Sequence, residues 1–464
     1  MELHEAYRRR RTIPVAVGSL TIGGDAPIRV QSMTTASTMD TQGCIEQAIR
    51  IIDAGGELVR LTAQGTREAL NLKEIREGLR ARGYDTPLVA DIHFNPAVAD
   101  VAATIVEKVR INPGNYVDPA RTFKQLEYTD QEYAAEIGRI RARLVPFLDI
   151  CRRHGTAVRI GVNHGSLSDR IMSRYGNTPA GMVESCMEFL RICVEQDFMN
   201  VVISIKASNT CVMIETVRLL VKQMDREGMV FPLHLGVTEA GSDMEGRIKS
   251  AVGIGALLAE GIGDTIRVSL SEAPEKEIPV ARKLVAYAPA SAEFRAASAK
   301  FISPDGILHL SYTEDSLEDL QLKAAMDAGA LLIDGKAKDL VIADTTGRFT
   351  KEQLQETADA ILQAARVRFT KPEYTSCPGC GRTLYNLEET IARIKAATGH
   401  LKGVKIAIMG CIVNGPGEMA DADYGYVGAG RGRISLYRGK ECIEKNIPEE
   451  QAVEHLLALI EKSE

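Results

Sequence analysis

The sequence predicts an α/β protein with a (β/α)8 TIM-type barrel followed by a small α+β domain. Two observations predict the barrel: eight short apolar, β-branched runs recur between residues 28 and 271, and longer segments with helical periodicity separate them. One such segment places Ile137, Ile140, Leu144 and Leu148 on a single helical face. Strands that alternate with helices pair in parallel through right-handed crossovers, and eight of them close a barrel.

The predicted strands follow in order along the first 270 residues, at 28–33, 57–62, 88–93, 108–113, 157–162, 200–206, 232–238 and 264–270. Before the first strand, a Gly23-Gly24 turn after an arginine-rich arm predicts a hairpin. A twin-arginine export signal at residues 8–11 is the alternative for that arm. An open doubly wound sheet is the alternative to the barrel, but no Gly-x-Gly-x-x-Gly motif follows the first strand and no P-loop motif is present.

After Ser271 the strand rhythm fades. The following hundred residues contain Pro-, Ala- and Ser-rich stretches, one candidate strand at 307–310 and helical patterns at 317–326 and 351–366. The end of the chain predicts a small α+β domain with strands at 404–409 and 433–437 and a closing helix at 451–460. We therefore expect three parts: a barrel at 12–285, a linker at 286–370 and a second domain at 371–464.

Composition sets loose limits on function. A net charge of −6 and a pI near 5.9 argue against nucleic-acid binding, and no stretch has the length and apolar character of a membrane helix. Nine cysteines, an odd number without the density of a disulfide scaffold, favour a reducing compartment, and we expect a cytoplasmic protein. The five early cysteines are expected to be buried small hydrophobes.

Five of the predicted strands carry a positively charged residue. Active sites of (β/α)8 barrels lie at the C-terminal ends of the strands, where this chain places Arg60, Arg110, Arg159, Lys206 and Arg267. Guanidinium groups suit phosphate oxygens, and pairing with Asp91 and Glu239 alone would leave positive charge over. The pattern favours a phosphorylated ligand, and in particular a doubly phosphorylated one, over purely structural ion pairs.

Other polar residues surround these cations. Glu239 follows the seventh strand, and a carboxyl group near phosphate charge retains its proton more readily, so it is a candidate general acid or base. His93 and His164 compete for that role. The strand ends also supply Asn163, Thr238 and Ser269, which are expected to orient or hydrogen-bond a ligand.

Three thiols near the C-terminus predict a metal or cluster site. Cys377-Pro-Gly-Cys380 and Cys411 supply three ligands, which leaves one corner of a cluster for another group. A zinc site completed by Cys442 is the alternative. The turn at 414–417 exposes backbone amides, the donors that stabilise cluster sulfurs, and Glu418 at its end can offer an oxygen to the fourth iron.

Seven motifs in order resemble the 4-hydroxy-3-methylbut-2-enyl diphosphate synthase family of the methylerythritol phosphate route to isoprenoids, over residues 13–285 and 370–464. They are Val30-Gln-Ser-Met-Thr34, Val109-Arg-Ile-Asn-Pro-Gly114, Arg159-Ile-Gly-Val-Asn-His-Gly-Ser-Leu167, Leu235-Gly-Val-Thr-Glu-Ala-Gly241, Gly261-Ile-Gly-Asp-Thr-Ile-Arg-Val-Ser269, Ser376-Cys-Pro-Gly-Cys-Gly-Arg-Thr383 and Met409-Gly-Cys-Ile-Val-Asn-Gly-Pro-Gly-Glu418. The resemblance implies the two-electron reductive dehydration of 2-C-methylerythritol 2,4-cyclodiphosphate, with electrons from reduced ferredoxin or flavodoxin.

The resemblance also implies roles for individual residues. A 4Fe-4S cluster would be ligated by Cys377, Cys380, Cys411 and Glu418, and Glu239 would donate a proton. The diphosphate would be bound by the five cations with His93, Asn163, Thr238 and Ser269. The 319–330 segment resembles the end of an insert found in long family members, so residues 286–370 are interpreted as its remnant, and a homodimer is expected. Two other classes stay open: a zinc-stabilised phosphate-binding barrel without redox activity, and an iron–sulfur sensor or carrier.

Overall fold

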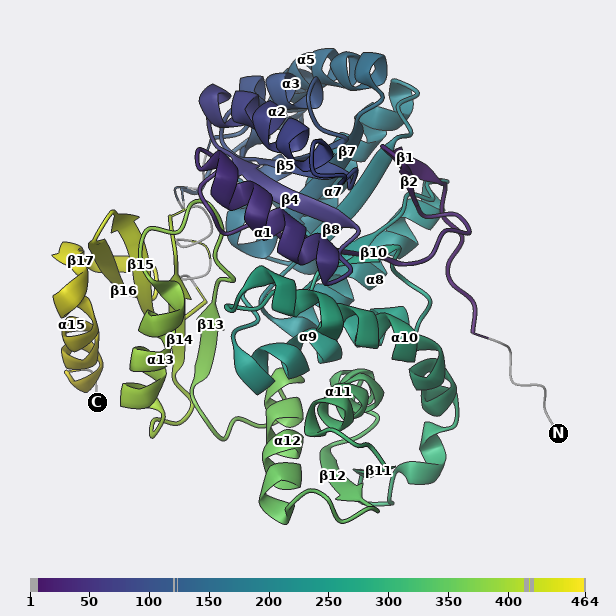
Figure 1. Cartoon of the computed structure of the whole chain (residues 1–464), viewed down its shortest axis with the longest axis vertical. Helices are drawn as coiled ribbons and strands as arrows, with labels where there is room; N and C mark the ends of the chain where they lie inside the picture. The colour runs from purple at the N-terminus through teal and green to yellow at the C-terminus, as the bar shows by residue number, and fades with distance from the viewer. Residues whose placement is uncertain (1–6, 120–121, 123, 413–416, 418–420, 463–464) are drawn as a thin grey trace.

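The structure is a computed structural model and describes residues 7–119, 122, 124–412, 417 and 421–462. It has three parts: a barrel, a middle segment packed against one side of it, and a C-terminal domain beside the barrel (Figure 1). None of the helices in the described ranges combines the length and the apolar character that crossing a bilayer requires.

Eight parallel strands form the barrel, in the order β8-β7-β6-β5-β4-β3-β10-β9. A further parallel bridge between Ile203 and Leu233 brings the first and last of these strands together. The predicted barrel is therefore confirmed, and each predicted run contains one strand: β3 (Arg29–Met33), β4 (Leu58–Ala63), β5 (Leu88–Ile92), β6 (Lys108–Ile111), β7 (Ala157–Asn163), β8 (Val201–Lys206), β9 (His234–Leu235) and β10 (Thr265–Ile266). The last two strands are only two residues long, so Thr238, Glu239 and Ser269 lie in the irregular backbone beyond them.

Helices follow the strands around the outside of the barrel (Figure 1). They are α1 (Thr41–Asp53), α2 (Thr66–Arg80), α3 (Pro96–Ala103), α4 (Pro113–Tyr116), α5 (Asp130–His154), α6 (Asp169–Tyr175), α7 (Pro179–Glu195), α8 (Thr210–Arg226), α9 (Asp243–Leu258) and α10 (Glu277–Ala296). The longest, α5, begins at a capping box in which Thr129 and Glu132 bond each other's backbone amides. Apolar faces of these helices and the strands form one continuous core.

The predicted hairpin is also present and closes one end of the barrel. Strands β1 (Val15–Val17) and β2 (Leu20–Ile22) pair antiparallel. Val15, Val17 and Ile22 are buried in a small cluster with Leu58 and Val89, which belong to β4 and β5. Because the hairpin packs on the early residues of the strands, the strand ends that carry the cations lie at the opposite opening.

The middle segment contains more regular structure than its composition predicts. The Pro-, Ala- and Ser-rich stretch at 287–292 lies inside α10, which runs without interruption past residue 285. Alanine is the best helix former, and the helix continues through Pro289 although proline removes one of its hydrogen bonds. Beyond α10 come β11 (Ile307–Tyr312), α11 (Leu317–Ile333), β12 (Asp339–Asp344) and α12 (Lys351–Ala364), of which β12 is absent from the predicted elements.

Close packing joins the middle segment to the barrel. Helix α11 is almost entirely buried against α9, and two glycines allow the approach: a Cβ at Gly255 would lie 2.5 Å from Met326, and one at Gly329 would lie 3.1 Å from the backbone of Val252. The parallel pair β11–β12 lies on the outer side of α11 (Figure 1). The middle segment is thus a folded βαβα unit attached to the barrel's last helices.

In the described part of the C-terminal domain, a five-stranded sheet is covered by the helix that follows its first strand and by the helix that follows its last strand. Its strands β13 (Glu373–Ser376), β14 (Lys405–Met409), β15 (Tyr424–Gly430), β16 (Arg433–Arg438) and β17 (Glu441–Pro448) lie side by side in chain order, parallel up to β15 and antiparallel after it. Helices α13 (Leu387–Thr398) and α15 (Glu449–Glu461) complete its core.

This domain is docked on the barrel of its own chain. Ala240, beyond β9, forms a parallel bridge with Ser376 of β13. Lys395 donates to Glu245 at 2.8 Å, and Ser271 Oγ donates to the carbonyl of Cys377 at 3.0 Å. A Cβ at Gly381 would lie 2.8 Å from the carbonyl oxygen of Ala36, so only glycine permits this approach.

Candidate active site

A cavity lies between the barrel opening and the C-terminal domain, with about 760 Å³ of empty space when the part open to solvent is included. The C-terminal domain covers the barrel opening and is called the cap below. The barrel and the cap contribute different side chains to the cavity. The barrel contributes Met33, Arg60, Asp91, His93, Arg110, Arg159, Asn163, Ser204, Lys206, Thr238, Glu239, Arg267 and Ser269, and the cap contributes Cys377, Pro378, Gly379, Cys380, Arg382, Thr383, Met409, Gly410 and Cys411. The structure therefore brings the predicted cations and the three predicted thiols to one chamber.

All five predicted cations are buried at this site. Arg60, Arg110, Arg159 and Lys206 extend from β4, β6, β7 and β8, and Arg267 directly follows β10. Arg159 is only 1% exposed. Small residues make room for these long side chains: a Cβ at Gly161 would lie 2.5 Å from Arg110 Nε, and one at Gly236 would lie 2.6 Å from Lys206 Nζ.

Two of these cations lack a compensating carboxylate within the described part of the chain. No ion pair is formed there by Arg159 or Lys206, and Arg159 Nε and Nη1 have no hydrogen-bond partner. Burial and the charge of Arg60 hold the pKa of both side chains well below its ordinary value. Lys108, at the start of β6, is also fully buried, and its pKa is lowered by burial and by the charge of Arg159. An anion in the cavity would compensate the charge of Arg159 and Lys206, which line it.

Arg267 differs because it has a dedicated partner. Its Nη2 lies 2.8 Å from Glu277 Oε1 and its Nε lies 2.9 Å from Oε2, a bidentate pair in which both side chains are nearly fully buried. Ser32 Oγ donates to the same carboxylate at 2.6 Å. Sequence reasoning missed Glu277, which lies in the first turn of α10 and is brought to the site only when that helix packs beside β3.

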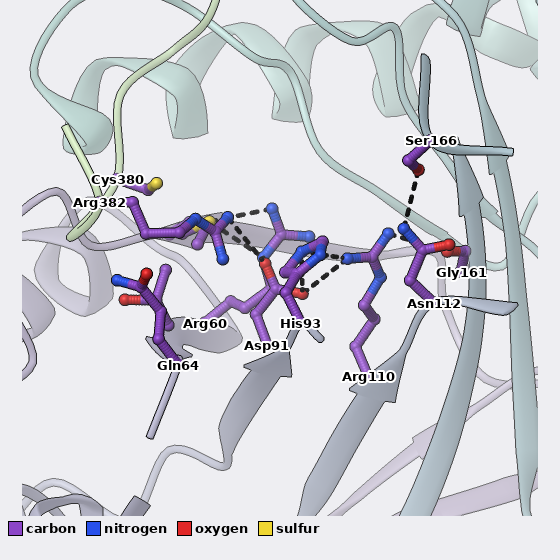
Figure 2. A network of polar contacts seen from close by, with 12 residues as sticks. Arg60, Gln64, Asp91, His93, Arg110, Asn112, Gly161, Ser166, Cys380 and Arg382 are labelled. Carbon is purple, nitrogen blue, oxygen red and sulfur yellow. Dashed lines mark hydrogen bonds and ion pairs between the residues drawn. The ribbon is translucent and has the colours of Figure 1, made fainter. Parts of the chain in front are cut away.

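Asp91, His93 and Arg110 form a polar network at the ends of β5 and β6 (Figure 2). Arg110 Nη1 lies 3.0 Å from Asp91 Oδ1 and 2.6 Å from His93 Nε2, while its Nη2 donates to the carbonyl of Gly161 at 2.8 Å. Burial and the charge of Arg382 lower the pKa of His93 to about 3, so its ring is neutral. Burial opposes ionisation of Asp91, but the charges of Arg110 and Arg60 hold its pKa well below the ordinary range.

Glu239 lines the cavity from a strained stretch of backbone. It is 2% exposed and has φ = 50°, in the left-handed region that few non-glycine residues adopt. Such strain occurs where surrounding structure holds a side chain in a required position, and it clusters at functional sites. Thr238, Asn163 and Ser269 line the same cavity, whereas His164 lies against the C-terminal domain, with Nδ1 3.3 Å from Asp421 Oδ2.

The three thiols are on the cap side of the cavity. Cys377 follows β13, Cys380 lies in the next turn and Cys411 follows β14. The amide of Gly410 donates to Cys377 Sγ at 3.2 Å, and burial together with Cys411 raises the pKa of Cys377 to about 12. The predicted ligand Glu418 lies outside the described residues.

The other cysteines lie apart from this site. Cys442 is on β17, at the far edge of the sheet from β13, and donates to the carbonyl of Glu444, so it does not complete a set of four thiols. As predicted for the early cysteines, four are buried apolar side chains, namely Cys44, Cys151, Cys186 and Cys193, and Cys211 is partly buried.

Arg382 is a sixth cation of the cavity and was missed by sequence reasoning. Its side chain is 9% exposed, and Nη2 lies 3.6 Å from Asp91 Oδ2 (Figure 2). The only signal available was its position two residues after Cys380. In the described residues that line the cavity, six cations face the carboxylates of Asp91 and Glu239.

Comparison with known proteins agrees with this architecture. The model of the GcpE TIM-barrel domain matches residues 12–282, and that of the GcpE protein C-terminal domain matches residues 373–462. The 4-hydroxy-3-methylbut-2-en-1-yl diphosphate synthase (flavodoxin) of Phocaeicola vulgatus is 52% identical, over 98% of both chains. The proteins of the same name from Bacteroides thetaiotaomicron and Akkermansia muciniphila are 51% and 41% identical, each over 98% of this chain and over 98% and 97% of their own lengths.

The alignment with the Phocaeicola protein has 601 positions, against 464 residues in this chain, so that relative carries more than a hundred residues that this chain lacks. Among solved structures, a Yersinia pestis dihydropteroate synthase matches 61% of this chain and 99% of its own, with 14% identity and a TM-score of 0.40. Two family models match this chain, and a named synthase is 52% identical to it over nearly the full length of both proteins. The chain therefore belongs to the GcpE family of 4-hydroxy-3-methylbut-2-en-1-yl diphosphate synthases.

Proposed function

We propose that this chain opens the ring of 2-C-methyl-D-erythritol 2,4-cyclodiphosphate and reduces it to 4-hydroxy-3-methylbut-2-enyl diphosphate. One carbon–oxygen bond to the diphosphate breaks, a hydroxyl group leaves as water, and two electrons with the protons required complete the alkene. The observation that carries the proposal is that one cavity is lined by buried cations on one side and by three thiols on the other. The names of the relatives state the product and an electron donor, flavodoxin.

The barrel's cations are proposed to bind the diphosphate. Arg159 and Lys206 have no ion pair among the described residues, so phosphate oxygens are the partners that would compensate their charge. Arg60 and Arg110 already share Asp91 and would hold a second phosphate group from the neighbouring strands. Arg267 is fixed in direction by Glu277. Neutral His93, Asn163, Thr238 and Ser269 supply hydrogen bonds at the same wall.

Glu239 is proposed to move a proton. Its carboxyl group lies in the cavity wall that faces the cap, and buried surroundings next to a bound diphosphate favour its protonated form. A protonated carboxyl group in this position can donate to the departing hydroxyl, which leaves far more readily as water. The strained backbone at this residue supports a positioned role over a purely structural one.

Cys377, Cys380 and Cys411 are proposed to hold a 4Fe-4S cluster, with Glu418 as the fourth ligand. The three thiols line one side of the same cavity, and Cys411 and Cys380 lie near enough to Cys377 for their charges to act on its thiol. That arrangement suits a cluster, whose ligands bind at separate iron corners. The Gly410 amide that donates to Cys377 Sγ is the kind of donor that stabilises cluster sulfurs. When bound, the cluster supplies single electrons next to the substrate site.

Flavodoxin, named in the relatives, is the proposed electron donor in preference to ferredoxin. The cap of this chain covers its own barrel, which supports a site assembled within one chain. The homodimer and the cytoplasmic location expected from the sequence stay predictions. The zinc-stabilised barrel without redox activity is not supported, because the relatives are named as flavodoxin-linked synthases.

Anaerobic purification and assay test the proposal. The protein is expected to be brown, to contain iron and sulfide, and to convert the cyclodiphosphate when supplied with reduced flavodoxin. A colourless, zinc-containing protein that does not consume the cyclodiphosphate would contradict it. An iron–sulfur sensor or carrier would retain the colour but form no product.

A further inference from the structure

Arg382 connects the two halves of the cavity. It belongs to the cap and lies between Cys380 and the barrel residue Asp91, with its side chain directed toward the Asp91–His93–Arg110 network (Figure 2). Of the six cations that line the cavity, the other five come from the barrel. Arg382 is therefore the cavity cation whose position depends on how the cap sits on the barrel.

Burial disfavours the charge of Arg382, but Cys380 and Asp91 beside it hold the pKa of its guanidinium group above the ordinary value. The contacts of its nitrogens are nevertheless incomplete for a buried guanidinium group. Its ion pair with Asp91 has a separation of 3.6 Å, longer than the 3.0 Å between Asp91 and Arg110. Arg382 Nε and Nη1 are buried and have no hydrogen-bond partner in the described part of the chain. Asp91 is shared with Arg60 as well, at 3.9 Å, so one carboxylate serves three arginines. Buried guanidinium N–H groups without partners are costly, and an anion in the cavity would satisfy them.

A purely structural role for Arg382 is the competing explanation. In that case the residue would hold the cap to the barrel through Asp91 whether or not an anion is present. The weak shared pairing and the two unsatisfied nitrogens argue against it, because a residue built only to fasten two domains would be expected to have a carboxylate of its own, as Arg267 has in Glu277.

We infer that Arg382 is a diphosphate-binding residue contributed by the cap, and that its pairing with the bound anion couples the docking of the cap to the presence of substrate. The inference rests on the proposed function, because it requires a diphosphate in the cavity. Through Arg382, a bound anion would stabilise the docked position of the cap on the barrel. Anion binding and cap docking would then be positively coupled.

The test uses the anaerobically purified holoenzyme with inorganic pyrophosphate as the probe. Calorimetry gives its affinity, and hydrogen–deuterium exchange with and without pyrophosphate reports the docking of the cap through the segments 240–246 and 373–384. Three variants are compared with the wild type. R382Q removes the charge, R382K keeps the charge without the planar fork, and R431Q changes an exposed arginine in the turn between β15 and β16 as a control.

Wild type and R431Q are expected to bind pyrophosphate equally and to show slower exchange in both segments when it is bound. R382Q is expected to bind about tenfold more weakly and to lose the pyrophosphate-dependent protection, although the barrel's cations still hold the anion. R382K is expected to bind pyrophosphate about threefold more weakly than wild type and to show partial protection. If R382Q does not retain its cluster, the result for R382K tests the inference.

Wild-type affinity and protection in R382Q, or in R382K where R382Q fails to assemble, would overturn the inference and leave the proposed function intact. Failure of the wild type to bind pyrophosphate would overturn both, because the anion site itself would then be wrong.

Discussion

Arg110 Nη1 lies 2.6 Å from Nε2 of His93, inside a cavity that holds several further cations. The contact requires His93 to be neutral and to accept through Nε2, since an imidazolium ring would present a positive N–H to the guanidinium group. Asn115 Nδ2 lies 3.4 Å from the other ring nitrogen. The histidine is thus a neutral support that orients the arginine, which leaves Glu239 as the proposed general acid.

The depressed pKa of His93 predicts a pH-dependent loss of stability. The pKa is about 3 in the folded protein and about 6.5 in the unfolded chain. Between these values the unfolded state binds more protons, so stability falls as pH drops below about 6.5. Replacing His93 by Gln removes this term. From pH 7 to pH 5, the wild type should lose about 2 kcal/mol more unfolding free energy than H93Q.

Urea unfolding at the two pH values measures this difference. The exposed His400, replaced by Gln, is the control and should keep the wild-type pH dependence. An H93Q protein with the same pH dependence as wild type would mean that the pKa of His93 is the same in the folded and the unfolded protein.

Glu239→Gln is expected to lower turnover by about 10²- to 10⁴-fold, the range typical of a lost general acid. The absorption and EPR spectra of the cluster should not change, because Glu239 belongs to the barrel and not to the thiol loops. Turnover with reduced flavodoxin, measured beside the exposed control Glu74→Gln, checks this prediction. Full activity in E239Q would show that Glu239 does not donate the proton.

Lys206→Met should make the substrate-free protein more stable while weakening anion binding. The substitution nearly preserves shape and removes a buried ammonium group that lies among like charges. Replacing buried charge by a packed apolar side chain can add about 1–4 kcal/mol of stability. Denaturant unfolding without ligand and calorimetry with pyrophosphate measure the two effects. A variant that loses stability would show that Lys206 has a compensating partner.

Glu277→Gln should destabilise the protein by about 3–5 kcal/mol, because it leaves the buried charge of Arg267 without its carboxylate. Glu275, two residues earlier, offers a matched control, since it pairs with the half-exposed Arg50. Glu275→Gln should change stability by less than about 1 kcal/mol. Equal effects of the two substitutions, measured by denaturant unfolding, would contradict the role assigned to the buried pair.

Cys411→Ser should abolish the cluster, whereas Cys442→Ser should retain it. Cys411 lines the cavity with Cys377 and Cys380, and Cys442 lies on the outer strand β17. Iron and sulfide content and the visible spectrum of the two anaerobically purified variants check the assignment. Loss of iron from C442S would show that Cys442 is a ligand of the cluster.

The positions of the five barrel cations could be predicted because they depend only on strand order. Once the eight runs are recognised, the inward-pointing side chains of neighbouring strands must meet in the interior of one barrel. Arg110 and Arg159 illustrate this, since each is paired with its neighbour by the parallel register. Cys377 and Cys380 could be grouped from their spacing within one loop, and Cys411 follows the neighbouring strand β14.

Glu277 and Arg382 could not be predicted in this way, because each meets its partner through tertiary packing. Glu277 reaches Arg267 only after α10 folds back across β3, and the second half of that helix was predicted as part of a linker. Arg382 reaches Asp91 across almost three hundred residues, through the docking of one domain on another. Neither contact has a periodic or local sequence signal.

The tethering of the cap to its own barrel has a kinetic consequence. The polypeptide passes from α10 through the βαβα unit, which is packed on α9, and then directly into β13, so the cap is held near the opening at a high effective concentration. Closing the chamber is then a first-order event. Activity per molecule should not fall on dilution, whereas a chamber closed by a neighbouring molecule would lose activity as the protein became scarce.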